Sequence, residues 1–421
     1  MPPAHNRLRI ALLTYRGNMF CGGQGIYTAY IARELHRLGH EVHVIAGPPL
    51  PDLEPGIPLH VIPNHNFFAL KGREALPAER PLRTLFPSHL YEYGVSRLGV
   101  FPEMTSFGLR LLVRWRALQR RHRFDVVLDN QSLSWGLLGI QASGVPVAAM
   151  VHHPLHIDRQ ADFAIDPRFR RKWKRTLYFP LLMQQVVLPR LARTLSVSHA
   201  SAREIERYFG ISGKQVDVVY NGTDTEIFRP VERRKETDLI FVGRTEDRKK
   251  GIPFLLEALA RTPEHITLKI VDGRIPDGGL VPRKIRELGL EKRVVLLERM
   301  LSVPELVSEY STARVALAPS FFEGFGFPAS EAMACGLPVI ATGSGALPEV
   351  VGTSGNAGLL VPFGDSVALA EAITQLANDP ALAARMGAAA RRRVEQVFSW
   401  REAGERTAGV LEEVVRAHGR S

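Results

Sequence analysis

Short apolar runs alternate with longer helix-type stretches along the chain. In the first half the runs that predict strands cover residues 8–15, 41–46, 125–129, 146–151 and 194–198, and a helix is predicted over 26–38. Strands that alternate with helices indicate a parallel sheet covered by helices on both faces. The region from 67 to 123 is the least regular part of the pattern.

The same alternation of predicted strands and helices begins again after Pro230. Strands are predicted over 239–243, 267–271, 294–297, 315–318 and 338–341, with a helix over 252–260. The sequence therefore predicts two doubly wound α/β domains, residues 1–220 and 221–395. The segment 396–421 contains an amphipathic helix over 399–418 with no later strand to join, and we expect it to pack back across both domains.

Composition fits a globular protein with two cores, since 45% of the 421 residues are apolar and 23% are charged. The only cysteines, Cys21 and Cys335, suit neither a disulfide framework nor a metal-ligand spacing, so a reducing cytoplasm is the expected compartment. The apolar run before Tyr15 is too short for a signal peptide, and no run approaches the roughly 20 residues that span a bilayer.

The net charge of +11 is concentrated in two segments. Residues 66–123 carry a net +7 and residues 168–193 a net +8, so the remainder is slightly acidic. The segment 168–183 also mixes its cations with Trp173, Tyr178 and Phe179, a composition typical of a membrane interface. We therefore hypothesise docking on an anionic membrane surface; the alternative is a solvated basic face.

Two candidate motifs follow strands of the first domain. The glycine loop Cys21-Gly-Gly-Gln-Gly25 allows the backbone amides of Gly22 and Gly23 to approach an anion at a helix N-terminus. The alternative is that this loop is a plain tight turn. It does not fit the dinucleotide-binding spacing. The run Val151-His-His-Pro-Leu-His156 places a histidine at a strand end; Pro154 disfavours a zinc site, and a structural histidine is the alternative.

Two further motifs follow strands of the second domain. Arg244 and Lys250 lie in a strand-to-helix turn and can together bind a diphosphate. In Glu323-Gly-Phe-Gly-Phe-Pro-Ala-Ser-Glu331, Pro328 suits a helix start near Ala329, so that Gly326, Phe327 and Pro328 bring backbone amides and the positive end of the helix dipole to an anion.

The two carboxylates of this stretch match the two sides of a nucleotide sugar. Glu323, in the loop, can accept hydrogen bonds from sugar hydroxyls, and Glu331, placed in the first helical turn, can accept both hydroxyls of a ribose. The alternative for Glu331 is helix capping alone.

In this order and at these strand ends, the motifs resemble the retaining GT-B glycosyltransferases of family 4. The resemblance covers nearly the whole chain, including MVHHPL, YNGTDTEIFRP, VGRTEDRKKG and EGFGFPASEAMACGLPVIAT. It implies two Rossmann-like domains facing across a cleft, with the acceptor held by the N-terminal domain.

The resemblance also implies residue roles. Arg244 and Lys250 bind the donor phosphates, Glu323 meets the transferred sugar, Glu331 the ribose, and His152 lies near that sugar, with His153 as an alternative for the last role. Members of this family need no metal and use a UDP- or GDP-linked sugar as substrate, so no metal or other cofactor is expected.

The resemblance implies net retention of configuration through same-face attack. We hypothesise that the acceptor is a lipid or lipid-linked molecule at the inner membrane leaflet.

Two other functions stay open. A nucleotide-sugar epimerase or a sugar phosphorylase would share the phosphate and ribose contacts. A basic nucleic-acid-binding protein is a different class, against which stands the lack of any recognised nucleic-acid motif.

Overall fold

The computed structural model describes residues 7–17, 23–64, 87–97, 101–157, 180–211 and 215–419. The chain forms two compact units. Unit 1 comprises residues 1–197, 201–219 and 400–421, and unit 2 comprises residues 198–200 and 220–399. The chain therefore crosses from one unit to the other before Tyr220 and returns to unit 1 for its last helix.

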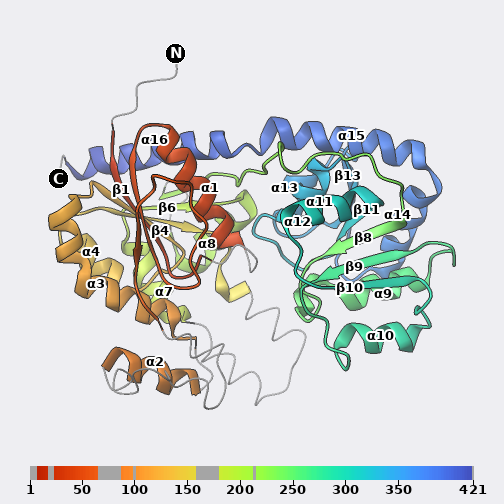
Figure 1. Cartoon of the computed structure of the whole chain (residues 1–421), viewed down its shortest axis with the longest axis horizontal. Helices are drawn as coiled ribbons and strands as arrows, with labels where there is room; N and C mark the ends of the chain where they lie inside the picture. The colour runs from red at the N-terminus through yellow and green to blue at the C-terminus, as the bar shows by residue number, and fades with distance from the viewer. Residues whose placement is uncertain are drawn as a thin grey trace. The chain divides into compact units, whose positions relative to one another are not determined.

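Unit 1 is built on a seven-stranded parallel sheet with the order β3-β2-β1-β4-β5-β6-β7 (Figure 1). Its strands are β1 (Arg9–Thr14), β2 (Glu41–Ala46), β3 (Leu59–Val61), β4 (Val126–Asn130), β5 (Val147–Val151), β6 (Arg193–Ser196) and β7 (Val216–Val218). Every residue of β4 and β5 is buried. This is the pattern of strands covered on both faces.

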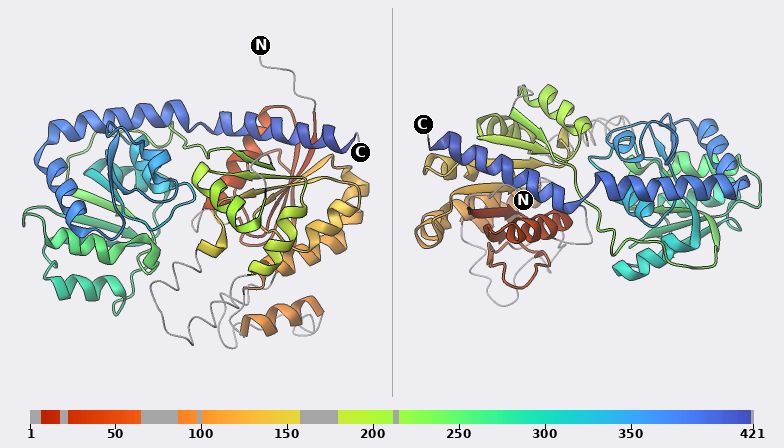
Figure 2. Two further views of the ribbon diagram at one scale, coloured as in Figure 1. Left: turned by 180° about the vertical axis from the view of Figure 1, so that it is seen from behind. Right: turned by 90° about the horizontal axis from the view of Figure 1, so that it is seen from above.

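Helices cover both faces of this sheet. The helices of unit 1 are α1 (Gly23–Arg37), α2 (Pro87–Arg97), α3 (Glu103–His122), α4 (Gly136–Ala142), α7 (Leu181–Val187), η3 (Leu188–Arg190), α8 (His199–Phe209) and α16 (Trp400–His418). Leu111 and Trp115 of α3 share a core with Ala11 and Leu13 of β1. On the other face α16 lies along α1, where the rings of Tyr30 and Trp400 stack at 4.9 Å (Figure 2).

Unit 2 is built on a six-stranded parallel sheet with the order β10-β9-β8-β11-β12-β13. The strands are β8 (Thr237–Val242), β9 (Leu268–Asp272), β10 (Val294–Glu298), β11 (Ala313–Ala318), β12 (Val339–Thr342) and β13 (Gly358–Val361). The helices are η5 (Arg248–Lys250), α9 (Ile252–Ala260), α10 (Leu280–Leu288), α11 (Val303–Thr312), α12 (Phe327–Ala334), α13 (Leu347–Val351), α14 (Ser366–Asn378) and α15 (Pro380–Val397). Figure 1 shows α9 and α10 on one face and α12 with α15 on the other.

The two parallel sheets confirm the predicted α/β class with two doubly wound domains. The sequence pattern missed three short strands, β3, β7 and β13. The predicted terminal helix is α16, whose contacts with α1 and β4 lie within unit 1. Among the described helices, none combines the length and the hydrophobicity that crossing a membrane requires.

Candidate functional site

The candidate donor site of unit 2 lies where the strand order of its sheet reverses. Strands β8 and β11 are neighbours, and the connections that leave them run in opposite directions along the sheet. Ligands of open α/β sheets bind at such a switch point, beyond the carboxyl ends of the strands. The loops that follow β8 and β11 contain the predicted residues Arg244, Lys250 and Glu323.

These two loops are held together by backbone contacts. The amide of Phe321 donates to the carbonyl of Lys249 at 2.7 Å. Gly251 has φ +71°, and a Cβ on it would lie 2.0 Å from the carbonyl oxygen of Pro319. Only glycine fits this close approach, so the sequence Lys250-Gly251 fixes Lys250 beside the loop that follows β11.

Lys250 and Glu323, both predicted site residues, form an ion pair. Lys250 Nζ lies 2.6 Å from Glu323 Oε1, and the hydroxyl of Ser320 donates to the same oxygen at 2.7 Å. The side chains are 23% and 18% exposed. The pair is thus reachable from solvent, and a bound phosphate can compete with the carboxylate for the ammonium group.

Arg244 stands at the start of the same turn. It follows Gly243, whose φ of +155° lets the chain leave β8 sharply. The next residue, Thr245, donates its amide and its hydroxyl to Asp272 Oδ2 at 2.6 and 2.8 Å, which anchors the turn to the end of β9. The guanidinium of Arg244 is exposed, and it donates no hydrogen bond to another residue within the described part of the chain.

The helix after the second loop begins earlier than predicted. Gly326, with φ +100°, is the N-cap, and α12 starts at Phe327 instead of near Ala329. Glu331 is therefore the fifth residue of the helix, and its predicted place in the first turn is wrong. The left-handed backbone of Gly326 lets the helix start at once, and Pro328 fits its first turn because no intrahelical donor is needed there.

Glu331 is more buried than the other predicted charged residues of unit 2, Arg244, Lys250 and Glu323. It is 8% exposed, and the hydroxyl of Tyr310 donates to its Oε2 at 3.3 Å. Burial raises the pKa of Glu331 to about 7. Helix capping does not fit this carboxylate, because Gly326 occupies the cap and Glu331 lies beyond the first turn. A buried acceptor of this kind is suited to the paired hydroxyls of a ligand that enters the site.

In unit 1 the corresponding switch point lies between β1 and β4. Gly23 opens α1 here, whereas Gly22 lies outside the described residues. Asn130, the last residue of β4, donates its amide to Gln24 O at 3.0 Å and to Thr28 Oγ1 at 2.8 Å. Asn130 thus ties the first turn of α1 to the end of β4.

His152 follows β5 and points to this same network. Its Nε2 lies 2.6 Å from Asn130 Oδ1, and because the Asn130 amide donates to α1, the imidazole must donate from Nε2. Its ring meets that of Tyr27 edge to face at 4.9 Å. Burial, with a smaller contribution from His153, lowers the pKa of His152 to about 3, so the ring is neutral near pH 7.

A tight turn after β4 also positions His152. Gln131 has φ +55° and Leu133 has φ +45°, both in the left-handed region. Gln131 accepts the His152 amide at 2.7 Å and donates to His153 O at 2.7 Å. The sequence interpretation did not single out Asn130 and Gln131, although both directly follow a predicted strand, which is the signal that could have found them.

The histidines of the run Val151–His156 do not share one environment. His156 stacks on Tyr208 with ring centroids 3.7 Å apart and lies 3.4 Å from Glu204, whereas His152 bonds to Asn130. Asp158, which follows this run, lies outside the described residues. Within the described chain these histidines are not grouped around one point.

Comparisons with known proteins define the family. Residues 21–227 match the family described as Glycosyltransferase Family 4, and residues 236–379 match Glycosyl transferases group 1. The chain is 37% identical to the MMP alpha-(1->4)-mannosyltransferase of Mycolicibacterium hassiacum, over 97% of this chain and 98% of the relative. This chain belongs to glycosyltransferase family 4 and is a GT-B glycosyltransferase.

Further comparisons agree with this assignment. The D-inositol 3-phosphate glycosyltransferase of Streptomyces bingchenggensis is 26% identical over 99% of this chain and 94% of the relative. Sucrose-phosphate synthase from Thermosynechococcus elongatus has a TM-score of 0.73 at 23% identity, covering 98% of this chain and all of that one. The Anabaena protein HepE, solved with UDP and glucose, has a TM-score of 0.68 at 19% identity, covering 96% of this chain and 99% of that one.

Proposed function

We propose that this glycosyltransferase moves a hexose from a nucleotide diphosphate sugar to an acceptor hydroxyl, with retention of configuration and without a metal. The observation that carries the proposal is the partly exposed pair of Lys250 and Glu323 at the switch point of unit 2, with Arg244 in the same strand-to-helix connection as Lys250. Two cations, a carboxylate and the start of α12 together match a diphosphate joined to a sugar. Solved structures of the same fold contain UDP or UDP-glucose, which supports this donor class.

Transfer of the sugar requires that the departing diphosphate is stabilised. As the bond from the anomeric carbon to the phosphate oxygen breaks, negative charge develops on that oxygen, and Arg244 and Lys250 offset it. The acceptor oxygen bonds to the anomeric carbon on the same face, and its proton passes to the leaving phosphate oxygen. Lys250 is paired with Glu323 before the donor binds, so donor binding leaves the Glu323 carboxylate available for sugar hydroxyls.

His152 suits a neutral role in this reaction. Its Nε2 is committed to Asn130, and its lowered pKa keeps the ring uncharged near pH 7. We propose that the remaining nitrogen, Nδ1, accepts a hydrogen bond from a hydroxyl of the transferred sugar. His152 then orients the sugar, and its ring stays neutral during turnover.

A donor screen tests the main proposal. UDP- and GDP-linked hexoses, with GDP-mannose first because of the mannosyltransferase relative, are tested for thermal stabilisation and then for turnover with and without acceptor. We expect transfer that requires an acceptor and persists in EDTA. Turnover to a new nucleotide sugar without acceptor would favour an epimerase, phosphorolysis would favour a phosphorylase, and activity restored only by Mg²⁺ would contradict metal independence.

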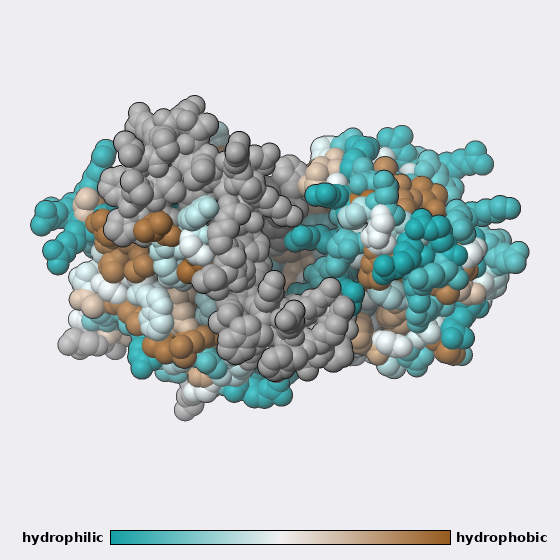
Figure 3. All heavy atoms as spheres, turned by 90° about the horizontal axis from the view of Figure 1, so that it is seen from below, coloured by the Kyte–Doolittle hydropathy of each residue, from teal (hydrophilic) through white to brown (hydrophobic). Residues whose placement is uncertain are grey.

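For the acceptor we propose a lipid or lipid-linked molecule, met by an enzyme that acts in the cytoplasm at an anionic membrane surface. Most of the predicted interface segment, 168–179, lies outside the described residues. The described helix α3 supports the proposal independently, because it exposes Val113 by 85% together with Arg116 and Arg120. On the described surface of unit 1, Figure 3 shows hydrophobic residues beside hydrophilic ones.

Liposome sedimentation tests this second proposal. We expect binding to anionic vesicles at low salt, because each surface Lys or Arg adds about 1 kcal/mol of attraction to anionic lipid. The double change Arg116→Glu and Arg120→Glu should weaken binding, and the matched double change Arg233→Glu and Arg234→Glu, on exposed arginines of unit 2, should not. Wild-type protein that stays unbound at low salt would leave a soluble acceptor as the better hypothesis.

A further inference from the structure

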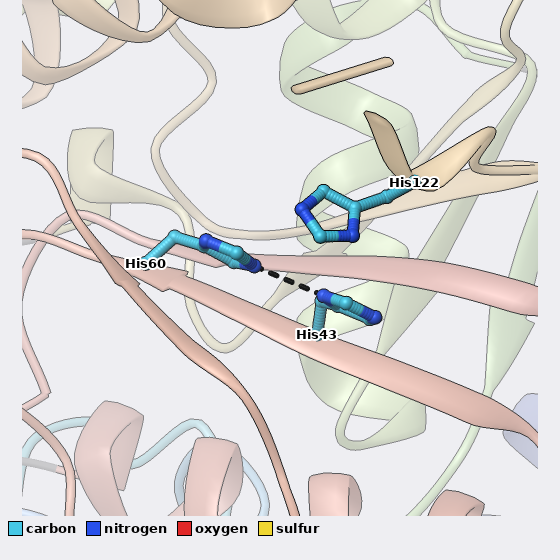
Figure 4. A group of neighbouring side chains, drawn as sticks. All are labelled: His43, His60 and His122. Carbon is cyan, nitrogen blue, oxygen red and sulfur yellow. Dashed lines mark hydrogen bonds between the residues drawn. The ribbon is translucent and has the colours of Figure 1, made fainter. Parts of the chain in front are cut away.

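Three histidines that lie far apart in the sequence meet at the edge of the unit 1 sheet. His43 lies on β2, His60 on the edge strand β3, and His122 in the last turn of α3. One ring nitrogen from each lies within 4.8 Å of the others. Figure 4 shows the three imidazoles facing one another, with His43 and His60 on neighbouring strands and His122 reaching them from the helix.

We propose that His43, His60 and His122 form a binding site for a divalent transition metal such as Zn²⁺, separate from the donor site. Three imidazoles are a donor set that suits Zn²⁺, Co²⁺ or Ni²⁺ and does not suit Mg²⁺ or Ca²⁺. A solvent molecule would complete a four-coordinate shell, since His60 and His122 are only partly buried.

The distances fit with a small adjustment. Ligand nitrogens about 2.0–2.1 Å from a tetrahedral Zn²⁺ stand roughly 3.4 Å from one another. His43 Nδ1 and His60 Nε2 are 2.9 Å apart, so they already have nearly this spacing. His122 lies within 4.8 Å of both and must approach more closely, and its Nε2 is buried without a hydrogen-bond partner among the described residues.

Glu41 provides the outer contact that metal-binding histidines usually have. His43 Nε2 lies 3.2 Å from Glu41 Oε1, so Nε2 carries the proton and donates to the carboxylate. This leaves Nδ1 of His43 as the acceptor that faces His60. For His60 to bind a metal through Nε2, its proton moves to Nδ1, and no net proton is released. A carboxylate behind a ligating imidazole orients the ring and makes it a better ligand.

The surroundings of His60 and His122 disfavour the charged form of these two imidazoles. Burial, together with His122, His43 and Arg121, lowers the pKa of His60 to about 4, and burial, His43 and Arg121 lower the pKa of His122. Neutral imidazole is the form that binds metals. The charge of Arg121 opposes a cation, and the carboxylate of Glu41 offsets it.

The position in the sheet points to a structural role. His43 lies near the amino end of β2, whereas the switch-point residues lie beyond the carboxyl ends of the strands. A metal bound here would join the edge strand β3 to the end of α3. It would thus stabilise unit 1 without taking part in sugar transfer, and removal of the metal should lower Tm but leave kcat unchanged at 25 °C.

Metal titration of the full chain tests the site. After treatment with chelator, Zn²⁺ should bind with one-to-one stoichiometry and raise Tm, and Co²⁺ should give the visible absorption of a tetrahedral complex. Glu41→Gln should weaken binding by roughly 10- to 100-fold, and His122→Ala, which removes a ligand, by more. His36→Ala, a change of an exposed histidine in α1, should bind as the wild type does.

The outcomes separate a metal site from a packed cluster of rings. Equal Zn²⁺ affinity of the wild type and His122→Ala, or no Zn²⁺ binding by the wild type at 100-fold molar excess, would overturn the proposal. If His122→Ala does not fold, anomalous diffraction at the zinc edge from wild-type crystals decides. A peak between the three rings supports the site, and its absence contradicts it.

Discussion

The switch points of the two units hold different chemistry on the same kind of sheet. In unit 2 the loops after β8 and β11 carry exposed or partly exposed charges, Arg244 and the pair Lys250–Glu323. In unit 1 the switch point holds buried neutral groups, with His152 bonded to Asn130. A charged, reachable site is suited to an anion that arrives and leaves, whereas a buried neutral network is suited to holding one ring in a fixed orientation.

The largest effect is expected when a cation of the unit 2 site is removed. Lys250→Ala and Arg244→Ala should each lower kcat by on the order of 10² or more, because these cations act on charge that develops only as the diphosphate leaves. Steady-state kinetics on the selected donor measures the change. Arg248→Ala, in the same turn, is the control and should retain near wild-type kcat. The circular dichroism spectra of Lys250→Ala and Arg244→Ala should match that of the wild type. A loss of secondary structure in these two variants would show that Lys250 and Arg244 have a structural role instead.

The buried carboxylate of unit 2 gives a pH-dependent effect on stability. The folded-state pKa of Glu331, about 7, exceeds its ordinary value of 4.5, so the folded state binds the proton more tightly and stability falls as pH rises between these values. Glu331→Gln removes this charge and should raise the free energy of unfolding by about 2–4 kcal/mol at pH 8, with little gain at pH 4.5. Urea unfolding at both pH values measures it, and equal gains would contradict the assigned burial.

The two carboxylates of unit 2 should separate binding from turnover. Glu331→Ala should mainly weaken donor binding and Glu323→Ala should mainly lower kcat, each by about 1.5–3 kcal/mol, which is roughly 10- to 150-fold. Calorimetric titration of the donor and steady-state kinetics measure the two effects. Small and equal changes in both variants would remove this division of roles.

The smallest expected effect concerns the neutral site of unit 1. His152→Gln should lower kcat/KM roughly 10-fold, as expected for one lost hydrogen bond of about 1.5 kcal/mol. Because the pKa of His152 is about 3, the pH profile between pH 5 and 9 should keep its shape in the variant. A wild-type limb near pH 6.5 that disappears in His152→Gln would show that the ring titrates during turnover.

Long buried strands and their ends could be predicted from the sequence because both leave local signals. Strand β2 matches its prediction residue for residue, and the glycine-marked turns after β8 and β11 carry the predicted Lys250 and Glu323. Strand β3 could not be found, because its three half-buried or exposed residues show no apolar run. The start of α12 was misplaced because the left-handed backbone of Gly326 is a tertiary feature, fixed where its loop packs on Leu347.

Contacts between distant segments left no signal in the sequence. His43, His60 and His122 lie far apart in the sequence, and the pairing of β2 with β3 and the length of α3 bring them together. The bond from His152 to Asn130 depends in the same way on the neighbouring positions of β4 and β5. Residues of this kind become visible only when strand order is known.

Hydrogen exchange with a bound nucleoside diphosphate tests the central claim, that the donor is held by unit 2 at its switch point. Exchange of the full chain is followed by mass spectrometry with and without UDP or GDP, whichever stabilises the protein. We predict slower exchange in peptides that contain residues 243–251 and 320–331. Slower exchange confined to the strand ends of unit 1, with no change in these two loops, would contradict the account.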